Sequence, residues 1–387
     1  MIRRKGRTRR FLAAAAVAVS ISLGASAALF STCGPFTDVA ADVFCPFVLE
    51  VFYVGITTGT TATTYDPSSP VSRLQMATFL SRGVDAVLLR GSRRAALGQF
   101  WKRGSNAFLE INLDTNTVGT AMAVSDGTDV FVSNTVNGKV FRVRNDGKVL
   151  ETTTGAAGAY GLVSAGGKVW VTSTPGNGDL YSIQPSVGAG FFGWYAFTGA
   201  NPTDITFDGT SIWTANLSGS VSRFNPATPA FSMVTTGFVS PFGILFDGSN
   251  VWVTDIGLNK LQKLDGNAAI LQTVTVGSSP RFPMFDGANI WVPNFLSNSV
   301  SIVHASTGAV VSTLTGNGLN GPVAAAFDGE RAMVTNYSGD SLSLWKAADL
   351  TTIGTVTLPP GSAPNGACSD GVNFWVALYG RGTLLRF

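Results

Sequence analysis

The feature that most constrains this chain is a repeat of about 40 residues in its C-terminal two thirds. An Asp-Gly pair stands at six positions of this period, and five residues after each of these aspartates stands Trp, Phe or Met. A seventh copy keeps the same offset with Ala165-Gly166 and Trp170, so that successive copies start 39 to 43 residues apart. The aspartates of the six Asp-Gly copies are Asp126, Asp208, Asp247, Asp286, Asp328 and Asp370. A fixed period of this length means that one supersecondary unit is stacked seven times.

Each copy is patterned for short β-strands. An apolar segment runs into Asp-Gly, a pair that tolerates the positive φ of a hairpin turn, and a strand such as Trp-Val-Thr follows. A third strand and a fourth come next, as in residues 260–264 and 271–276. A period near 40 residues with four strands is typical of a β-propeller blade. We therefore predict a mainly β fold, with a seven-bladed β-propeller over residues 107–387.

The two ends of this region predict how the ring closes. The chain ends on a third strand at 383–387, and the region begins with a lone fourth strand at 108–113. Together these segments complete one blade. We expect the two ends to pair, because a closed ring leaves no open sheet edge.

The repeat strings also carry a family resemblance. Phe-Val-Ser-Asn at 131–134 and Trp-Val-Thr-Asp at 252–255 resemble the YVTN and NHL-type seven-bladed propellers, a group that includes virginiamycin B lyase. The resemblance covers nearly all of residues 107–387. It implies the fold but not the activity, because such propellers serve as enzymes, binding platforms and surface proteins.

The N-terminal residues 1–27 are patterned for export. Six Arg and Lys residues precede an uncharged apolar stretch at 11–30, and Ala25-Ser26-Ala27 stands near its end. These are the three parts of a secretory signal peptide, so we predict cleavage after Ala27 and an extracellular or cell-envelope location. The alternative is an uncleaved anchor, since twenty apolar residues can just span a bilayer; after cleavage we expect no membrane span.

The charge balance argues against nucleic acid as a partner. The whole chain has 26 Lys and Arg against 23 Asp and Glu, but six of the basic residues lie in the first ten positions. The remaining chain is slightly acidic. Nucleic-acid binding needs a basic face, and this charge balance gives no indication of one. We therefore expect no nucleic-acid partner.

Residues 33–90 form a second predicted module, of helix, Gly/Thr-rich loop and helix. Its segments 36–39 (Phe-Thr-Asp-Val), 55–59 (Gly-Ile-Thr-Thr-Gly), 65–67 (Tyr-Asp-Pro) and 73–82 resemble an S-layer homology module. The resemblance implies a small α-helical module that associates with cell-wall polysaccharide. It also implies a carbohydrate contact for Arg73, at the start of the last helix. A solvated arginine at a helix start is the alternative for Arg73. Family members often use three modules where this chain has one, so assembly of several copies and a structural remnant both stay open.

The cysteines fit the same compartment. Cys33 and Cys45 lie close together in the short module, and exported proteins meet oxidising conditions, so we predict a disulfide between them. Cys368 is then unpaired, and we expect it to act as a small buried apolar residue. Residues 91–106 are a basic linker, either solvated or in contact with an anionic polymer.

A candidate binding site lies at the mouth of the propeller. Asp204, Arg281 and Asn365 follow prolines near the starts of predicted inner strands. We expect them at the mouth together with three residues that share one repeat position, Asp255, Asn294 and Asn336. The alternative for these last three is a turn cap, which is the common role of a polar residue repeated at one position.

The sequence favours binding over catalysis. Lyases of the virginiamycin B type rely on a histidine and a magnesium ion, whereas His304, the only histidine here, stands at the end of a third strand, where we expect a structural or surface role. No Cys or His cluster has metal-ligand spacing. We predict no catalytic residue, no metal and no cofactor. The hypothesis is an exported cell-surface protein whose propeller is a non-enzymatic platform for an unidentified ligand or protein. The alternative is an extracellular enzyme of lyase or lactonase type.

Overall fold

The computed structural model describes residues 108–387, apart from 115–116, 175–177, 186–191 and 196–198, together with scattered positions between 33 and 80. The chain divides into two compact units, Met1–Gly91 and Ser92–Phe387. The predicted signal segment 1–27, Arg73 and the linker 91–106 lie outside the described residues. No helix in the described part of the chain is long and apolar enough to cross a membrane.

The first unit has a small core beside a disulfide. Cys33 and Cys45 are bonded, with their Cα atoms 5.5 Å apart. Phe36 is fully buried, and its ring contacts those of Phe52 and Tyr65 at centroid distances of 5.0 and 5.4 Å. Aromatic contacts of this kind are the main source of burial that so small a module has.

One carboxylate joins two of the segments that carry the S-layer homology resemblance. Asp38 accepts hydrogen bonds from the main-chain N–H groups of Tyr65 and Asp66, at 2.7 to 3.0 Å. These bonds lower the pKa of Asp38, because they stabilise the ionised carboxylate. The segments 36–39 and 65–67 are therefore held together. The helical character of the module remains a prediction.

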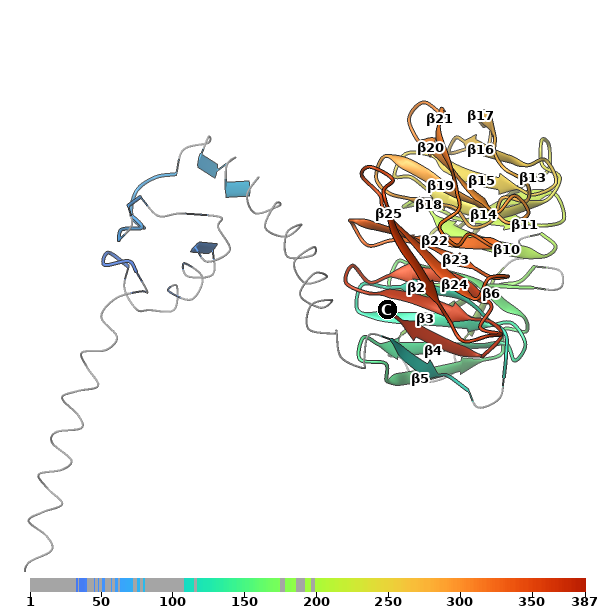
Figure 1. Ribbon diagram of the computed structural model, residues 1–387, viewed down its shortest axis with the longest axis horizontal. Helices are drawn as coiled ribbons and strands as arrows, with labels where there is room; N and C mark the ends of the chain where they lie inside the picture. The colour runs from blue at the N-terminus through green and yellow to red at the C-terminus, as the bar shows by residue number, and fades with distance from the viewer. Residues whose placement is uncertain are drawn as a thin grey trace, which may run out of the picture. The chain divides into compact units, whose positions relative to one another are not determined.

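The second unit contains seven antiparallel sheets of four strands each, and this confirms the predicted propeller. In Figure 1 the sheets surround a common centre. The first four blades along the chain are β2–β5 (Thr120–Ser125, Asp129–Asn134, Lys139–Arg144, Val149–Thr154), β6–β9 (Ala159–Ala165, Lys168–Ser173, Leu180–Ile183, Phe192–Tyr195), β10–β13 (Pro202–Phe207, Ile212–Asn216, Ser220–Asn225, Ala230–Val234) and β14–β17 (Pro241–Phe246, Val251–Asp255, Lys260–Leu264, Ile270–Thr275). The last three are β18–β21 (Met284–Phe285, Asn289–Asn294, Ser299–His304, Val310–Thr315), β22–β25 (Pro322–Phe327, Arg331–Asn336, Ser341–Lys346, Thr352–Thr357) and the closing blade, β26 (Pro364–Ser369), β27 (Phe374–Leu378), β28 (Thr383–Arg386) and β1 (Leu109–Asn112).

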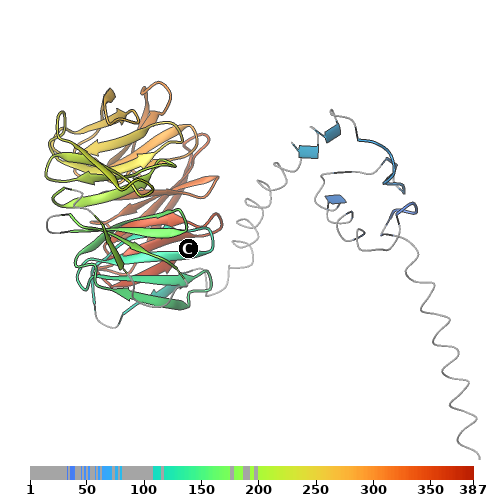
Figure 2. The same cartoon turned by 180° about the vertical axis from the view of Figure 1, so that it is seen from behind.

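The closing blade confirms that the two ends of the propeller region pair. β1 lies antiparallel to β28, with Leu109 opposite Arg386 and Asn112 opposite Thr383. The Arg381 guanidinium also donates to the Glu110 carboxylate at 2.7 Å. The inner strand β26 packs against β2, which completes the ring, and both views place the red C-terminal strands beside the green first blade (Figures 1 and 2).

The repeated aspartate stabilises the turn between the first two strands of its blade. We call this turn, with the residue five positions on that the aspartate contacts, the frame of the blade. In the fourth blade, one Asp247 oxygen accepts the N–H groups of Ser249 and Asn250, and the other accepts the Trp252 indole N–H at 2.7 Å. The same indole bond, at 2.7 to 2.8 Å, joins Trp213, Trp291 and Trp375 to the aspartate five residues earlier. The predicted turn role of this aspartate is confirmed, and the indole bond explains the spacing of five. A buried indole N–H needs an acceptor.

Two copies without this Asp–Trp pair replace the bond in other ways. In the degenerate second blade, the Trp170 indole donates to the Ala165 carbonyl at 3.2 Å. In the sixth blade, where Met333 replaces Trp, the Arg331 Nε donates to Asp328 at 2.7 Å. The frame is therefore stabilised even in these two copies, where a residue of the motif is replaced.

Candidate functional site

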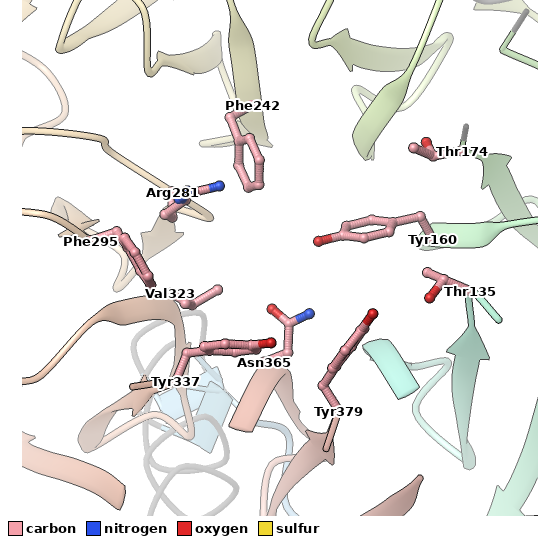
Figure 3. Close-up of a pocket in the computed structure, with 10 residues that line it drawn as sticks. All are labelled: Thr135, Tyr160, Thr174, Phe242, Arg281, Phe295, Val323, Tyr337, Asn365 and Tyr379. Carbon is pink, nitrogen blue, oxygen red and sulfur yellow. The ribbon is translucent and has the colours of Figure 1, made fainter. Parts of the chain in front are cut away.

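A pocket opens at the centre of the propeller, with a volume of about 350 Å³. Figure 3 shows side chains from several blades around one space. The lining is mainly aromatic and uncharged. The ten lining residues are Thr135, Tyr160, Thr174, Phe242, Arg281, Phe295, Val323, Tyr337, Asn365 and Tyr379.

All ten lining residues come from two positions of the repeat. One position lies five residues before the repeated Asp, or before Ala165 in the degenerate copy, and the other lies nine residues after it. The first position supplies Tyr160, Phe242, Arg281, Val323 and Asn365. The second supplies Thr135, Thr174, Phe295, Tyr337 and Tyr379. We call these the two mouth positions. Residues at both positions surround the central axis of the propeller, and their types vary from blade to blade.

Irregular pairing of the inner strands sets the orientation of the side chain at the first mouth position. In six blades the pairing register shifts across this position, as between Pro241 and Ile244 in β14. A bulge of this kind bends a strand and re-aims its side chain. In the seventh case, β18 is reduced to Met284–Phe285, because Pro283 has no N–H to donate to a ladder. Arg281 lies in the irregular segment before it.

Hydroxyl groups of the neighbouring blade also hydrogen-bond to the main chain at the first mouth position. In three blades, the Ser or Thr two residues after the repeated aromatic or Met donates to the carbonyl of a mouth residue in the next blade. These bonds join Ser133 to Tyr160 (2.6 Å), Thr254 to Arg281 (2.8 Å) and Thr335 to Asn365 (2.8 Å). The pocket lining is thus held by buried bonds between blades, which preorganises it.

Arg281 is the one charged residue of the lining. Its guanidinium lies 4.2 Å from the Phe242 ring centroid and 5.0 Å from that of Phe295, a cation–π arrangement. Its buried Nε has no hydrogen-bond partner, and no ion pair with Arg281 occurs in the described part of the chain. Burial lowers the pKa of Arg281, but an arginine remains protonated at neutral pH.

Neutral hydrogen-bonding groups face Arg281 across the pocket. The Tyr160 hydroxyl hydrogen-bonds with the Asn365 side chain, and burial raises the pKa of Tyr160 to about 12. The rings of Tyr337 and Tyr379 contact each other at 6.1 Å. In Figure 3 the hydroxyls of all three tyrosines, the Asn365 amide and the guanidinium are directed into the shared space.

Asp204 lies next to the pocket but not in its lining. It is 7% exposed, and its two oxygens accept the main-chain N–H groups of Ile205 (2.9 Å) and Ile244 (2.8 Å). Burial raises the pKa of Asp204 to about 7, although the two N–H groups oppose the shift. The carboxyl therefore links the third and fourth blades.

The other three predicted mouth residues are bonded within their own blades. Asn294 and Asn336 are fully buried, and each amide donates to two serine hydroxyls of the next strand. Asp255 accepts four main-chain N–H groups around the adjoining turns. The structure thus brings Arg281 and Asn365 together, whereas Asp255 has the turn-capping geometry of the alternative interpretation, and Asn294 and Asn336 join neighbouring strands of their own blades.

His304 does not line the pocket either. It ends β20, and its Nδ1 lies 3.1 and 3.3 Å from the hydroxyls of Ser306 and Thr307 in the following turn. Cys368 is an unpaired, half-buried thiol that packs against a core cluster, and burial raises its pKa.

The donors at the pocket do not fit the magnesium ion of the lyases. Mg²⁺ prefers carboxylate and water oxygens, and the ten lining residues include no carboxylate. Asp204, the carboxylate beside the pocket, has both oxygens engaged with main-chain N–H groups. Within the described ranges, no group of three or more His, Cys, Asp or Glu is arranged to hold a metal ion.

Most of the lining was not predicted from the sequence. Arg281 and Asn365 were predicted at the mouth, whereas the three tyrosines, the two phenylalanines and Val323 were not. The missed signal was variation within a repeat: at the two mouth positions, a regular array carries Tyr, Phe, Arg and Asn in different copies. A repeat position that changes from copy to copy does not serve the common frame.

No protein-family model and no curated protein matches this chain. Solved structures match its fold. A streptogramin B lyase structure aligns with a TM-score of 0.61 and 17% identity, over 72% of this chain and 96% of the lyase. A catalytically inactive variant of virginiamycin B lyase from Staphylococcus aureus, solved with quinupristin, aligns with a TM-score of 0.62, 17% identity and coverage of 72% and 98%.

A propeller of the WD40 type aligns almost as well. The WD40 β-propeller domain of Doa1 has a TM-score of 0.59 and 12% identity, over 72% of this chain and 94% of that domain. At these identities the likeness concerns the fold and not the chemistry. The chain is thus a seven-bladed β-propeller that resembles virginiamycin B lyase in fold.

Proposed function

We propose that this is an exported envelope protein whose first unit associates with cell-wall polysaccharide and whose propeller binds a ligand in the mouth pocket without transforming it. The observation that carries the propeller's role is the lining itself. It combines six aromatic or apolar side chains with a few convergent polar groups, the usual composition of a small-molecule site. Its ten residues include no carboxylate, histidine or cysteine to act as a base or nucleophile.

Exposed apolar residues beside the mouth support the same assignment. Val136 and Leu296 directly follow the lining residues Thr135 and Phe295, and are 60% and 68% exposed. Val239, which lies against the Gly257 turn, is 54% exposed. Each of these exposed side chains lies close in sequence to a lining residue of its own blade, so they add apolar surface near the pocket.

The wall-binding part of the proposal rests on the resemblance of residues 33–90 to an S-layer homology module. The disulfide and the Asp38 bonds between two of its motifs are consistent with a folded module in an oxidising compartment. Arg73 is the proposed carbohydrate contact.

A pull-down on purified cell-wall sacculi tests the anchoring and separates it from the propeller. The full chain is compared with Arg73→Ala, with Tyr379→Ala at the mouth, and with Arg93→Ala as a charge-matched control in the linker. We expect binding that Arg73→Ala removes and that the other two variants retain. Loss only in Tyr379→Ala would move wall recognition to the propeller, and no binding by the unaltered chain would contradict the anchoring.

The second candidate is an extracellular enzyme of lyase or lactonase type. The observation that favours it is Asp204, a buried carboxyl with a pKa of about 7, a value suited to a general base at neutral pH. Against it, both carboxyl oxygens are occupied by main-chain N–H groups. Hydrolysis or elimination of a cyclic ester by the purified protein, lost in Asp204→Asn, would favour the enzyme over the binding platform.

A further inference from the structure

The Arg281 cation lacks a counter-ion. Its buried Nε has no partner, and within the described ranges no carboxylate pairs with it. Half-buried charges in proteins are normally paired, because removing a charge from water without compensation is costly. The polar groups of the lining offer it only phenol and threonine hydroxyls and an amide. A negatively charged ligand group would supply the missing partner.

The aromatic side chains restrict how such a group can approach. The rings of Phe242 and Phe295 pack against the guanidinium at 4.2 and 5.0 Å. Its N–H edge is then the part left for a ligand. A planar carboxylate matches that edge with two parallel hydrogen bonds.

The remaining lining fits the body of a small ring. Tyr160, Tyr337 and Tyr379 offer both aromatic faces and hydroxyls, and Asn365 offers a donor and an acceptor. The volume of about 350 Å³ is at the small end of ligand pockets. It suits a single substituted ring.

We propose that the mouth pocket selects a small molecule carrying a carboxylate on a six-membered ring. Arg281 binds the carboxylate, the aromatic side chains cover the ring, and the tyrosine hydroxyls with Asn365 bind its polar substituents. This inference rests on the proposed binding function of the pocket. Two sources share the chemistry, an aromatic acid and a uronic acid.

Calorimetric titration of the full chain with matched pairs tests the inference. One pair is benzoate and benzamide, and the other is glucuronate and glucuronamide; the tighter-binding carboxylate identifies the source. We expect at least one carboxylate to bind at least tenfold more tightly than its amide. Arg281→Gln should remove this preference, and Arg281→Lys should retain part of it.

A second arginine provides the matched control. Arg223 stacks on Trp213 at 5.6 Å and bonds Ser211, but it lies outside the lining. Arg223→Gln should leave the carboxylate preference unchanged. If Arg223→Gln lowers it as much as Arg281→Gln does, the preference does not arise at the mouth and the inference is wrong.

Other outcomes separate the inference from the function on which it rests. Equal binding of acid and amide, abolished by Tyr379→Ala, would overturn the carboxylate preference while supporting a ligand pocket. Binding that neither Arg281→Gln nor Tyr379→Ala changes would overturn both. If none of the four compounds binds up to 20 mM, the inference is wrong, and the binding function is then judged by a wider compound screen with the same two variants.

Discussion

The frame of the blades and the mouth of the propeller use one repeat in opposite ways. In the frame, the same Asp accepts the same turn N–H groups in every Asp-Gly copy and the Trp indole in four of them. At the mouth, two repeat positions carry different residues in each blade and meet around one pocket. The repeated aspartates bond the turn N–H groups of their own blades, whereas Arg281 at the mouth has a buried Nε without a partner. In this repeat fold, the repeat positions that keep their residue type thus stabilise every blade. The positions whose residue type changes from blade to blade form the single pocket of the ring.

The largest effect is expected where the frame joins the two ends of the chain. Deleting residues 384–387 removes most of β28, including the buried Leu384 and Leu385. We expect no soluble, cooperatively folding protein, because β1 would lose its neighbouring strand and β27 one of its two. Circular dichroism and size-exclusion chromatography are the measurements. The control Arg386→Ala keeps the main chain of β28 and removes only a partly exposed side chain with its bond to the Asn145 carbonyl, so it should still fold; a soluble truncated protein with a sharp thermal transition would refute closure by the chain ends.

A single frame aspartate should have a smaller but clear effect. Asp247→Ala removes the oxygen that accepts two turn N–H groups and leaves the buried Trp252 indole N–H without an acceptor. We expect a loss of roughly 2–4 kcal/mol in the free energy of unfolding, measured by urea denaturation.

The control for this prediction is Asp265→Ala. Asp265 also accepts two turn N–H groups, from Asn267 and Ala269, but no indole. Its loss should cost about 1 kcal/mol or less. Equal costs at Asp247 and Asp265 would mean that the indole bond contributes little to the frame.

Asp204 lies between the frame and the mouth, and its raised pKa should make the stability of the protein depend on pH. Its pKa is about 7 in the folded protein, against 3.8 for an unperturbed Asp, so the folded state binds the proton more tightly than the unfolded state. The stabilisation is therefore fully present below about pH 4 and is lost as the pH rises to 7. The slope from this one group reaches at most about 1.4 kcal/mol per pH unit.

Thermal unfolding from pH 4 to 7 checks this expectation. Asp204→Asn should remove the falling component and leave a flatter profile, whatever its effect on stability at one pH. Tyr160 does not interfere, because its pKa of about 12 lies far above this range. Identical profiles for the two proteins would show that Asp204 is ionised throughout.

The smallest effect on stability is expected at the mouth itself. Arg281→Gln removes the cation–π contacts but also an unpaired half-buried charge. These contributions oppose each other, so we expect a change within about 1 kcal/mol, well below that of Asp247→Ala in the same denaturation assay. A cost of about 3 kcal/mol or more, the size of a broken buried network, would place Arg281 in the frame and not in a ligand site.

The sequence predicted the fold well because the frame depends on local patterns. The Asp-Gly turns and the apolar strands lie within one copy, and the lone strand expected at 108–113 is β1, Leu109–Asn112. Even ring closure followed from counting the strands at the two ends. These features need only hydrophobic alternation and turn chemistry, which are visible along the chain.

The site was harder to predict because it depends on how blades meet. Asp204 and Tyr160 lie near equivalent starts of inner strands, yet the bulge there aims Tyr160 at the axis and buries Asp204 between blades. A shift of one residue exchanges the two faces of a strand, and alternation in sequence does not reveal it. Tyr160 was further hidden because its copy has Ala165 in place of Asp.

The central claim is that ligand recognition lies at the two mouth positions. Saturation-transfer NMR of the full chain with a library of small acids, amides and sugars tests it most directly, using Tyr379→Ala as the mouth variant and Asp265→Ala as the frame control. The account predicts ligands whose signals disappear with Tyr379→Ala and persist with Asp265→Ala. Ligands that bind the mouth variant as well as the unaltered protein would contradict it.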